Sequence, residues 1–234
     1  MQPLIHKHIP KTTKEIFGQD DVIKQLKNFI VNFSKEKKNS ALIYGPSGTG
    51  KTCSVYAIAN ELGYEVIECN ASEFRNAEQI NLKVGNAIKQ QSLFAKGKVI
   101  LVDEIDGLTG HEDRGGVQAI TKLIEDSSYP IILTATNPFD NKFSSLRRKS
   151  NMIEFKALDY LSIFNILKKI CEDEKIKFDE DVLKALSRRA GGDARAAIND
   201  LQLLTQDKKE LSTQSLEELA ERNKTDNIMT ALNK

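Results

Sequence analysis

The chain of 234 residues contains no tryptophan, only three cysteines and no long apolar stretch. A membrane-spanning helix needs roughly 18 or more apolar residues in a row, and the amino terminus also lacks the apolar core of a signal peptide. The cysteines are odd in number and lack CxxC spacing, which is typical of reduced thiols and argues against a disulfide or zinc framework. These absences predict a soluble, intracellular protein.

Net charge is also nearly absent, because 34 Lys and Arg residues balance 33 Asp and Glu residues to leave +1. Attraction to nucleic acid would therefore have to come from a local patch and not from the whole surface. His6 and His8 form an HxH pair. No carboxylate or thiol accompanies this pair in the sequence, so we expect a solvated terminus and no metal site.

Glycine is concentrated in the stretch ALIYGPSGTGKT, residues 41–52. It places a short apolar strand, a glycine-rich loop and a helix start in succession, and it fits GxxxxGKT at every required position. The glycines let successive N–H groups point inward at phosphate, while Lys51 reaches the terminal phosphates and Thr52 offers its hydroxyl to Mg²⁺. The residues that we expect to contact a nucleotide here are Gly45, Pro46, Ser47, Gly48, Thr49, Gly50, Lys51, Thr52 and Cys53.

A second chemical feature follows the apolar run Val99–Val102, which is typical of a strand buried on both faces. It ends in Asp103 and Glu104, and acids at the carboxyl end of a buried parallel strand face the nucleotide crevice. We expect Asp103 to hold Mg²⁺ and Glu104 to deprotonate the attacking water. Asn137, at the end of a neighbouring strand, is placed to orient that water.

Strands and helices alternate as far as Phe155, which predicts an α/β fold with a five-stranded parallel sheet. No strand pattern follows, so we place a domain boundary near Lys156 and a small all-helical lid after it. The expected division is 1–155, 156–212 and a linker at 213–234. The strands are expected at 41–44, 64–69, 98–103, 131–136 and 152–155, and the helices at 19–33, 77–91, 158–171, 179–190 and 193–206.

Within the lid, Asp193 is expected to cap a helix whose first turn carries Arg195. A cation is unfavourable near the positive end of a helix dipole. An anion would relieve this repulsion, and the γ-phosphate of the nucleotide is the obvious candidate, although on dipole grounds alone a plain surface arginine remains an alternative.

Taken together these segments resemble the AAA+ ATPases, and among them the clamp loaders, specifically the large subunits of archaeal or eukaryotic replication factor C. GPSGTGKT is similar to Walker A, VILVDEID to Walker B, TATN to sensor 1 and GGDARAAINDLQ to sensor 2. The resemblance implies ATP and Mg²⁺ as cofactors. It implies these roles: Lys51 and Thr52 on phosphate and Mg²⁺, Asp103 on Mg²⁺, Glu104 in catalysis, Asn137 on water and Arg195 on the γ-phosphate.

Two features resemble the large subunit more than the small ones. HEDRGGVQAI, residues 111–120, is similar to the large subunit's segment after Walker B. The small subunits carry Ser-Arg-Cys, whose arginine reaches a neighbour's ATP site, whereas here Lys149 occupies that position after Leu146 and Arg147. Lysine lacks the planar bidentate fork of arginine, so we interpret Lys149 as part of a basic surface turn.

The two ends of the chain depart from the family pattern. Residues 1–13 read as an extended arm and lack the tryptophan, tyrosine and arginine of PWxEKYRPK, which puts adenine contacts by the arm in doubt. Phe17 and Gly18, with Gln19, do match the motif that lines the adenine pocket. The stretch 227–234 resembles the lead into the helical collar through which subunits assemble, so we expect a truncated or partial large subunit.

The resemblance implies a clamp-loader subunit that uses ATP to open the sliding clamp (PCNA) and to load it onto primer-template DNA during replication. Replication factor C small subunits would be its partners in a hetero-oligomer, in the cytoplasm or nucleoid, or in the nucleus of a eukaryote. Ile120, Leu123 and Ile124 are equally open to a role as clamp anchors or as core residues. Arg75 and Arg114 are the candidates for DNA contact.

Two alternatives belong to other functional classes. One is a structural scaffold that binds ATP with little turnover, against which the presence of Glu104 argues. The other is a protein-remodelling AAA+ machine, against which the lack of an aromatic-hydrophobic-glycine pore loop after the second strand argues.

Overall fold

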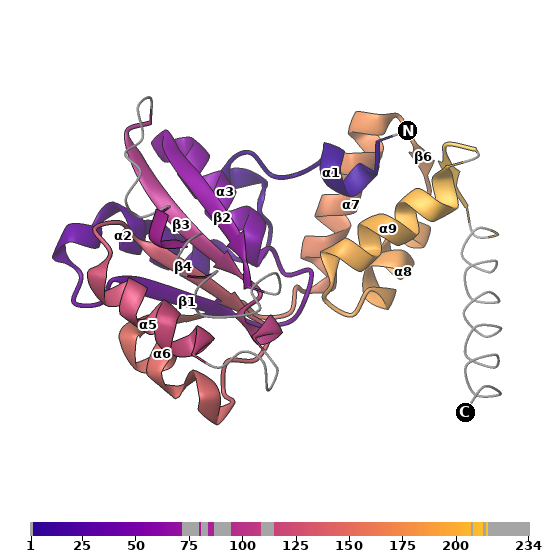
Figure 1. Cartoon of the computed structure of the whole chain (residues 1–234). Helices are drawn as coiled ribbons and strands as arrows, with labels where there is room; N and C mark the ends of the chain where they lie inside the picture. Colours follow the sequence, from indigo (N-terminus) through magenta and orange to yellow (C-terminus); the bar gives the residue numbers. More distant parts are fainter. Residues whose placement is uncertain are drawn as a thin grey trace, which may run out of the picture. The chain divides into compact units, whose positions relative to one another are not determined.

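A computed structural model describes residues 2–71, 80, 84–86, 95–108, 115–206, 208–212 and 214 (Figure 1). The chain divides into two compact units, one of Pro10–Lys156 and the other of Met1–Ile9 with Ala157–Lys234. Two peptide bonds therefore cross from one unit to the other, after Ile9 and after Lys156. None of the helices in the described ranges is long and apolar enough to cross a membrane.

The larger unit contains the predicted five-stranded sheet, and its four strand pairings are all parallel. The strand order is β2-β3-β4-β1-β5, so the strand that leads into the glycine-rich loop lies between β4 and β5. This order brings the carboxyl ends of β1, β3 and β4 to one edge. The strands are β1 (Ser40–Tyr44), β2 (Tyr64–Asn70), β3 (Gly97–Asp103), β4 (Ile131–Ala135) and β5 (Ser150–Glu154).

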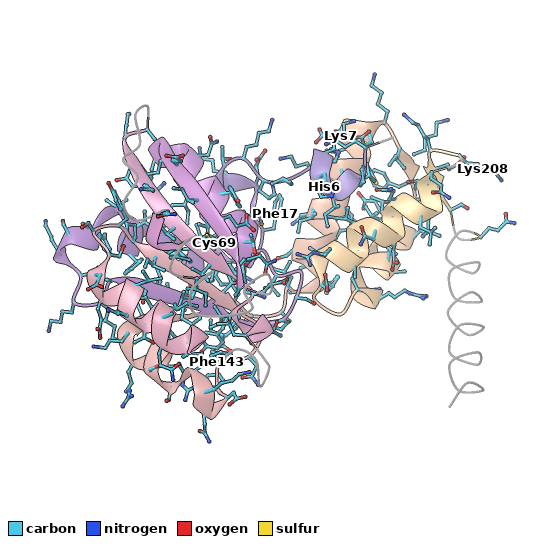
Figure 2. The ribbon with its side chains drawn as sticks, viewed as in Figure 1. His6, Lys7, Phe17, Cys69, Phe143 and Lys208 are labelled. Atoms are coloured by element: carbon cyan, nitrogen blue, oxygen red, sulfur yellow. The ribbon has the colours of Figure 1, made fainter. Side chains whose placement is uncertain are left out.

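Side chains of the central strands alternate between two apolar clusters, one on each face of the sheet. On β3, Val99 and Leu101 join the cluster beside α2 (Asp20–Val31) and α3 (Lys51–Leu62). Ile100 and Val102 join the cluster on the opposite face, beside α5 (Gly116–Asp126) and α6 (Ser144–Lys149). Figure 1 shows these helix pairs covering opposite faces of the sheet, and Figure 2 labels Phe143, a core residue of the α5 and α6 side.

Burial decides between the two interpretations of the apolar residues on α5. Ile120 and Ile124 are each 1% exposed and belong to the core cluster, and Leu123 packs against it. Ile120 and Ile124 are therefore core residues, which favours that one of the two interpretations. The reason is that the helix's apolar stripe is used entirely to cover the sheet.

The smaller unit is built on three helices, α7 (Tyr160–Glu174), α8 (Glu180–Arg189) and α9 (Ala194–Thr205). The lid is not wholly helical as predicted, because β6 (Lys177–Phe178) pairs in parallel with β7 (Glu210–Leu211). Strands of two residues are too short to show the alternation by which a strand is predicted.

The amino-terminal arm also differs from the prediction of an extended segment belonging to the nucleotide domain. Residues Leu4–Lys7 form a short helix, α1, and Leu4 and Ile5 pack against the core of the smaller unit. Lys7, labelled in Figure 2, pairs with Glu174 at 2.6 Å, and His8 Nε2 lies 2.7 Å from the same carboxylate. His8 is thus held against α7 and is not part of a solvated terminus.

Short 3₁₀ helices complete the described ranges. They are Thr13–Glu15, Phe33–Lys35, Ile105–Gly107 and Asn141–Phe143. The predicted helix at 77–91, residues 111–114 of the large-subunit segment and the stretch 227–234 lie wholly or mostly outside the described residues.

Candidate nucleotide site

The glycine-rich loop joins the end of β1 to the start of α3, and its glycines are required by its shape. Gly45, Gly48 and Gly50 have φ angles of 144°, 64° and 95°, which side chains rarely adopt. A Cβ on Gly45 would lie 1.9 Å from the carbonyl oxygen of Phe155, because the chain after β5 passes directly against the loop. The Gly45 N–H is itself bonded to the carbonyl oxygen of Ala135 at 3.2 Å.

Hydrogen bonds inside the loop fix its curvature. Lys51 Nζ donates to the carbonyl oxygens of Gly45 and Pro46 at 2.8 and 2.7 Å, so the ammonium group lies over the loop. Thr49 Oγ1 donates to the same Pro46 carbonyl at 2.9 Å. The exposed residues Pro46 and Ser47 form the loop's outer rim. The start of α3 then presents backbone N–H groups toward any anion that lies inside this curve.

The first turn of α3 brings Thr52 against the carboxylate at the end of β3. Thr52 Oγ1 donates to Asp103 Oδ1 and Oδ2 at 3.1 and 3.2 Å. Asp103 is only 9% exposed. The neighbouring Cys53 turns its thiol back toward the Gly50 carbonyl, with Sγ and oxygen 3.3 Å apart, and so packs under the loop.

Thr134, the residue before the last of β4, forms hydrogen bonds with both acidic residues. Its hydroxyl donates to Asp103 Oδ1 at 2.5 Å and accepts the backbone N–H of Glu104 at 2.8 Å. Sequence reasoning assigned no role to Thr134. The signal that could have found it is a single hydroxyl inside the otherwise apolar strand IILTA, which is fully buried and adjacent to β3.

Glu104 leaves the strand in a left-handed conformation, with φ 55° and ψ 53°. Such a conformation is unfavourable for a residue with a Cβ, and it is typically found where surrounding bonds enforce it. The Glu104 carbonyl accepts the Gly107 N–H at 2.8 Å, which closes the 3₁₀ turn after it. The side chain of Glu104 is exposed at the carboxyl edge of the sheet.

Asn137 stands at the same edge, two residues beyond the end of β4, and is exposed. Its Oδ1 accepts the backbone N–H of Phe139 at 3.0 Å. This bond assigns the oxygen to the protein side, so the Nδ2 group is left as the donor that faces outward.

Residues 16–19 lie next to the glycine-rich loop. Ile16 Cγ2 is 3.8 Å from the position that a Cβ on Gly50 would occupy, and Gln19 Nε2 donates to the Thr49 and Lys156 carbonyls at 3.4 and 2.8 Å. Between them, Phe17 is half-buried and Gly18 is exposed with φ 76°. The structure thus brings this predicted motif together with the loop.

The remaining predicted site residues are Arg195, Arg75 and Arg114. Arg195 is exposed in the first turn of α9, within the smaller unit, where the Asp193 side chain caps the helix as predicted by accepting the Ala196 N–H at 2.9 Å. Arg75 and Arg114 lie outside the described residues. Their roles stay predictions.

Tyr44, the last residue of β1, has a raised pKa because of burial first and the negative charge of Glu154 second. It remains neutral beside the loop. Within the described ranges, no three His, Cys, Asp or Glu side chains gather closely enough to hold a metal by themselves. A hydroxyl and a carboxylate in contact, Thr52 and Asp103, fit Mg²⁺, which is usually bound through one or two protein oxygens together with waters and phosphate.

Residues 41–158, half of the chain, match the family described as "ATPase family associated with various cellular activities (AAA)". The chain belongs to the AAA family of ATPases. Residues 165–204 of this AAA protein also match the "RCF1/5-like, AAA+ ATPase lid domain". An AAA fold implies nucleotide binding, which agrees with the glycine-rich loop at the end of β1.

Relatives named replication factor C large subunit resemble this AAA protein over most of its length. The protein of Nanoarchaeum equitans is 51% identical over 203 residues, which cover 86% of this chain and 47% of the relative. That of Staphylothermus marinus is 44% identical over 206 residues, covering 87% and 49%. The chain therefore spans about half the length of these relatives, and the similarity agrees with the resemblance to clamp-loader large subunits.

A solved structure described as the Thermotoga maritima RuvB Holliday junction branch migration motor has the same fold. Its TM-score is 0.71 at 20% identity, over 91% of this chain and 72% of that one. This likeness concerns the fold alone. It agrees with the predicted AAA+ architecture of a parallel sheet followed by a helical lid domain.

Proposed function

We propose that this AAA protein binds and hydrolyses ATP as the large-subunit component of a clamp loader. The observation that carries the proposal is the hydrogen-bonded series Thr52, Asp103, Thr134 and Glu104 at the mouth of the glycine-rich loop. It places a hydroxyl and carboxylate pair for Mg²⁺ beside a separate, exposed carboxylate that can act as a base.

Each residue has a distinct role in this proposal. The loop N–H groups and Lys51 hold the phosphates, and Thr52 with Asp103 holds Mg²⁺. Mg²⁺, when bound, neutralises charge on the phosphoryl oxygens. Glu104 accepts a proton from the attacking water. The outward Nδ2 of Asn137 orients that water.

Arg195 is proposed to reach the γ-phosphate from the lid. It would thereby make the lid responsive to which nucleotide is bound, because only ATP offers that group. The support for this role is the position of Arg195 in the first turn of α9, where an anion is favoured.

The relatives' name, replication factor C large subunit, supports the wider assignment. Under it, the partners are replication factor C small subunits, the sliding clamp and primer-template DNA. ATP binding favours the clamp-gripping state of the assembly, and hydrolysis releases the closed clamp.

The experiment is steady-state ATP hydrolysis by this chain mixed with small subunits, with and without sliding clamp and primed DNA. Glu104→Gln keeps the size and hydrogen-bonding capacity of the side chain but removes the base. We expect it to leave ATP binding within about twofold and to lower turnover by 10²-fold or more, in the range of general-base contributions.

Glu65→Gln is the matched control, since Glu65 is exposed near the start of β2, at the opposite edge of the sheet. Stimulation by clamp and DNA that Glu104→Gln abolishes and Glu65→Gln preserves supports a motor subunit. Turnover that is equal in the wild type and Glu104→Gln contradicts the proposal and favours a scaffold that binds ATP without using it.

A further inference from the structure

Arg147 lies in the short helix α6 and directs its guanidinium group at the segment that follows Asn137. Its Nη1 donates to the carbonyl oxygen of Asp140 at 2.7 Å and also to that of Pro138. The preceding residue, Leu146, is fully buried in the sheet's core, so the helix that carries Arg147 is firmly seated. The half-buried arginine thus bonds two carbonyls of one tight turn.

Phe139, between those two carbonyls, connects the same turn to the glycine-rich loop. The ring is 60% exposed, yet it packs edge-on against Tyr44 with 5.4 Å between ring centroids, and the Arg147 guanidinium lies 6.0 Å from its centre. Tyr44 directly precedes Gly45. Arg147 therefore holds the turn in two ways, by hydrogen bonds to the backbone carbonyls of the turn and by contact with the Phe139 ring.

The turn in question determines how Asn137 is oriented. The Phe139 N–H that Asn137 Oδ1 accepts lies inside the segment that Arg147 holds, at 3.0 Å from that oxygen. If this N–H moves, the asparagine amide loses the bond that fixes its rotamer and the outward direction of Nδ2. A side chain that must orient water is sensitive to shifts of this kind, because rates fall steeply with misplacement.

We propose that Arg147 is a positioning residue for ATP hydrolysis, which acts through Asn137 by fixing the turn at Pro138–Asp140. The proposal rests on the proposed function, since it assigns Arg147 to the same reaction. This role differs from a role in folding alone, because Arg147 affects turnover only through the side chain of Asn137.

A double-mutant cycle tests this dependence. Arg147→Ala is expected to lower kcat about tenfold with KM for ATP within twofold, because the phosphate-binding loop is intact. In the Asn137→Ala background the same substitution is expected to change kcat by less than twofold, since the side chain that it positions has gone. Equal losses in both backgrounds, or a change in KM alone, would overturn the proposal.

Arg148→Ala is the matched control, because Arg148 is the next residue of the same helix and is exposed. It is expected to leave kcat unchanged. Arg147→Lys provides a conservative variant if the alanine variant is poorly folded. A lysine can still donate to one of the two carbonyls, so we expect a loss of about threefold.

A readout independent of turnover separates failure of this proposal from failure of the proposed function. The chain has no tryptophan, so Phe139→Trp places a single indole on the turn. Arg147→Ala in that background is expected to raise acrylamide quenching, by less than twofold because the ring at this position is already 60% exposed, and Arg148→Ala is expected not to.

If the quenching rises but the wild type does not hydrolyse ATP, the turn is held as described and the proposed function is wrong. If the quenching does not change, Arg147 does not hold the turn, and the inference falls whatever the ATPase assay shows.

Discussion

Replacing Thr134 by valine removes one hydroxyl and leaves the shape of the side chain almost unchanged. Thr134 is 1% exposed, so no water is expected to replace the hydroxyl. Two groups each lose a hydrogen bond at once. These are the Glu104 N–H, which donates at 2.8 Å, and Asp103 Oδ1, which accepts from the hydroxyl.

The cost to stability follows from these two losses. A buried N–H left without an acceptor costs about 1–3 kcal/mol, and a hydrogen bond to a charged group contributes about 1.5–3 kcal/mol. Asp103 keeps its contact with Thr52 at 3.1 Å, which limits the second loss. We therefore expect the free energy of unfolding to fall by about 2–4 kcal/mol in total.

The effect on turnover should exceed the effect on binding. The left-handed backbone of Glu104 is held by this N–H bond from one side, so its loss lets the carboxylate shift. A displacement of about 1 Å can cost on the order of 10²-fold in rate. We expect kcat to fall between about tenfold and 10²-fold, with the affinity for ATP in the absence of Mg²⁺ within threefold.

Steady-state ATPase assays and urea unfolding of Thr134→Val and Thr134→Ser measure both quantities. Serine keeps the hydroxyl and loses only a methyl group, so its kcat should stay within threefold of the wild type. The reasoning is refuted if valine turns over ATP like the wild type, or if serine and valine are equally impaired.

Two further predictions concern folding. The pKa of Glu61 is lowered in the folded state from its ordinary value of 4.5 to about 2, chiefly by its hydrogen bond from Lys27. The stability that it contributes should be complete above about pH 4.5 and disappear as the pH falls toward 2, and urea unfolding of Glu61→Gln across that range should lack this component. Gly45→Ala should fail to give soluble folded protein, because its Cβ would meet the Phe155 carbonyl. Gly191→Ala has nothing within 4 Å of its Cβ and should remain folded. Its φ of 60° should cause only a small loss of stability, which thermal unfolding measures.

The sheet could be predicted from the sequence because its strands carry strong and local patterns. The run Val99–Val102 is apolar on both faces, and the central strands β1, β3 and β4 are followed by Gly45, Glu104 and Thr136. The glycine-rich loop was predictable for a similar reason, since its backbone requires glycine at fixed positions.

The amino-terminal helix and the two-residue strands of the lid could not be predicted in this way. Leu4–Lys7 is barely one helical turn, so it shows no period, and its stability comes from Leu4 and Ile5 packing on residues more than 150 positions away. The backbone N–H of Leu4 donates a hydrogen bond to Gln202 Oε1 at 2.7 Å, and no local sequence pattern predicts this contact.

The site shows the same division between what is local and what is not. Sequence order is sufficient to place Asp103 and Glu104 after a buried strand, but not to say which way each points. Alternation alone would send two successive side chains to opposite faces. Glu104 instead turns into the left-handed region, where an isolated residue with a Cβ would be disfavoured by about 1–2 kcal/mol.

That cost is offset by two hydrogen bonds of Glu104, from its N–H to the Thr134 hydroxyl and to its carbonyl oxygen from the Gly107 N–H. Both bonds exist only in the folded state. The consequence is that the carboxylates which motif reasoning treats as a pair are held by different means. Asp103 is buried and fixed by two hydroxyls, whereas Glu104 is exposed and, among the residues that the structure describes, is bonded through its main chain. A metal ligand needs the first arrangement and a proton acceptor needs the second, so the backbone turn at Glu104 would separate the two proposed roles.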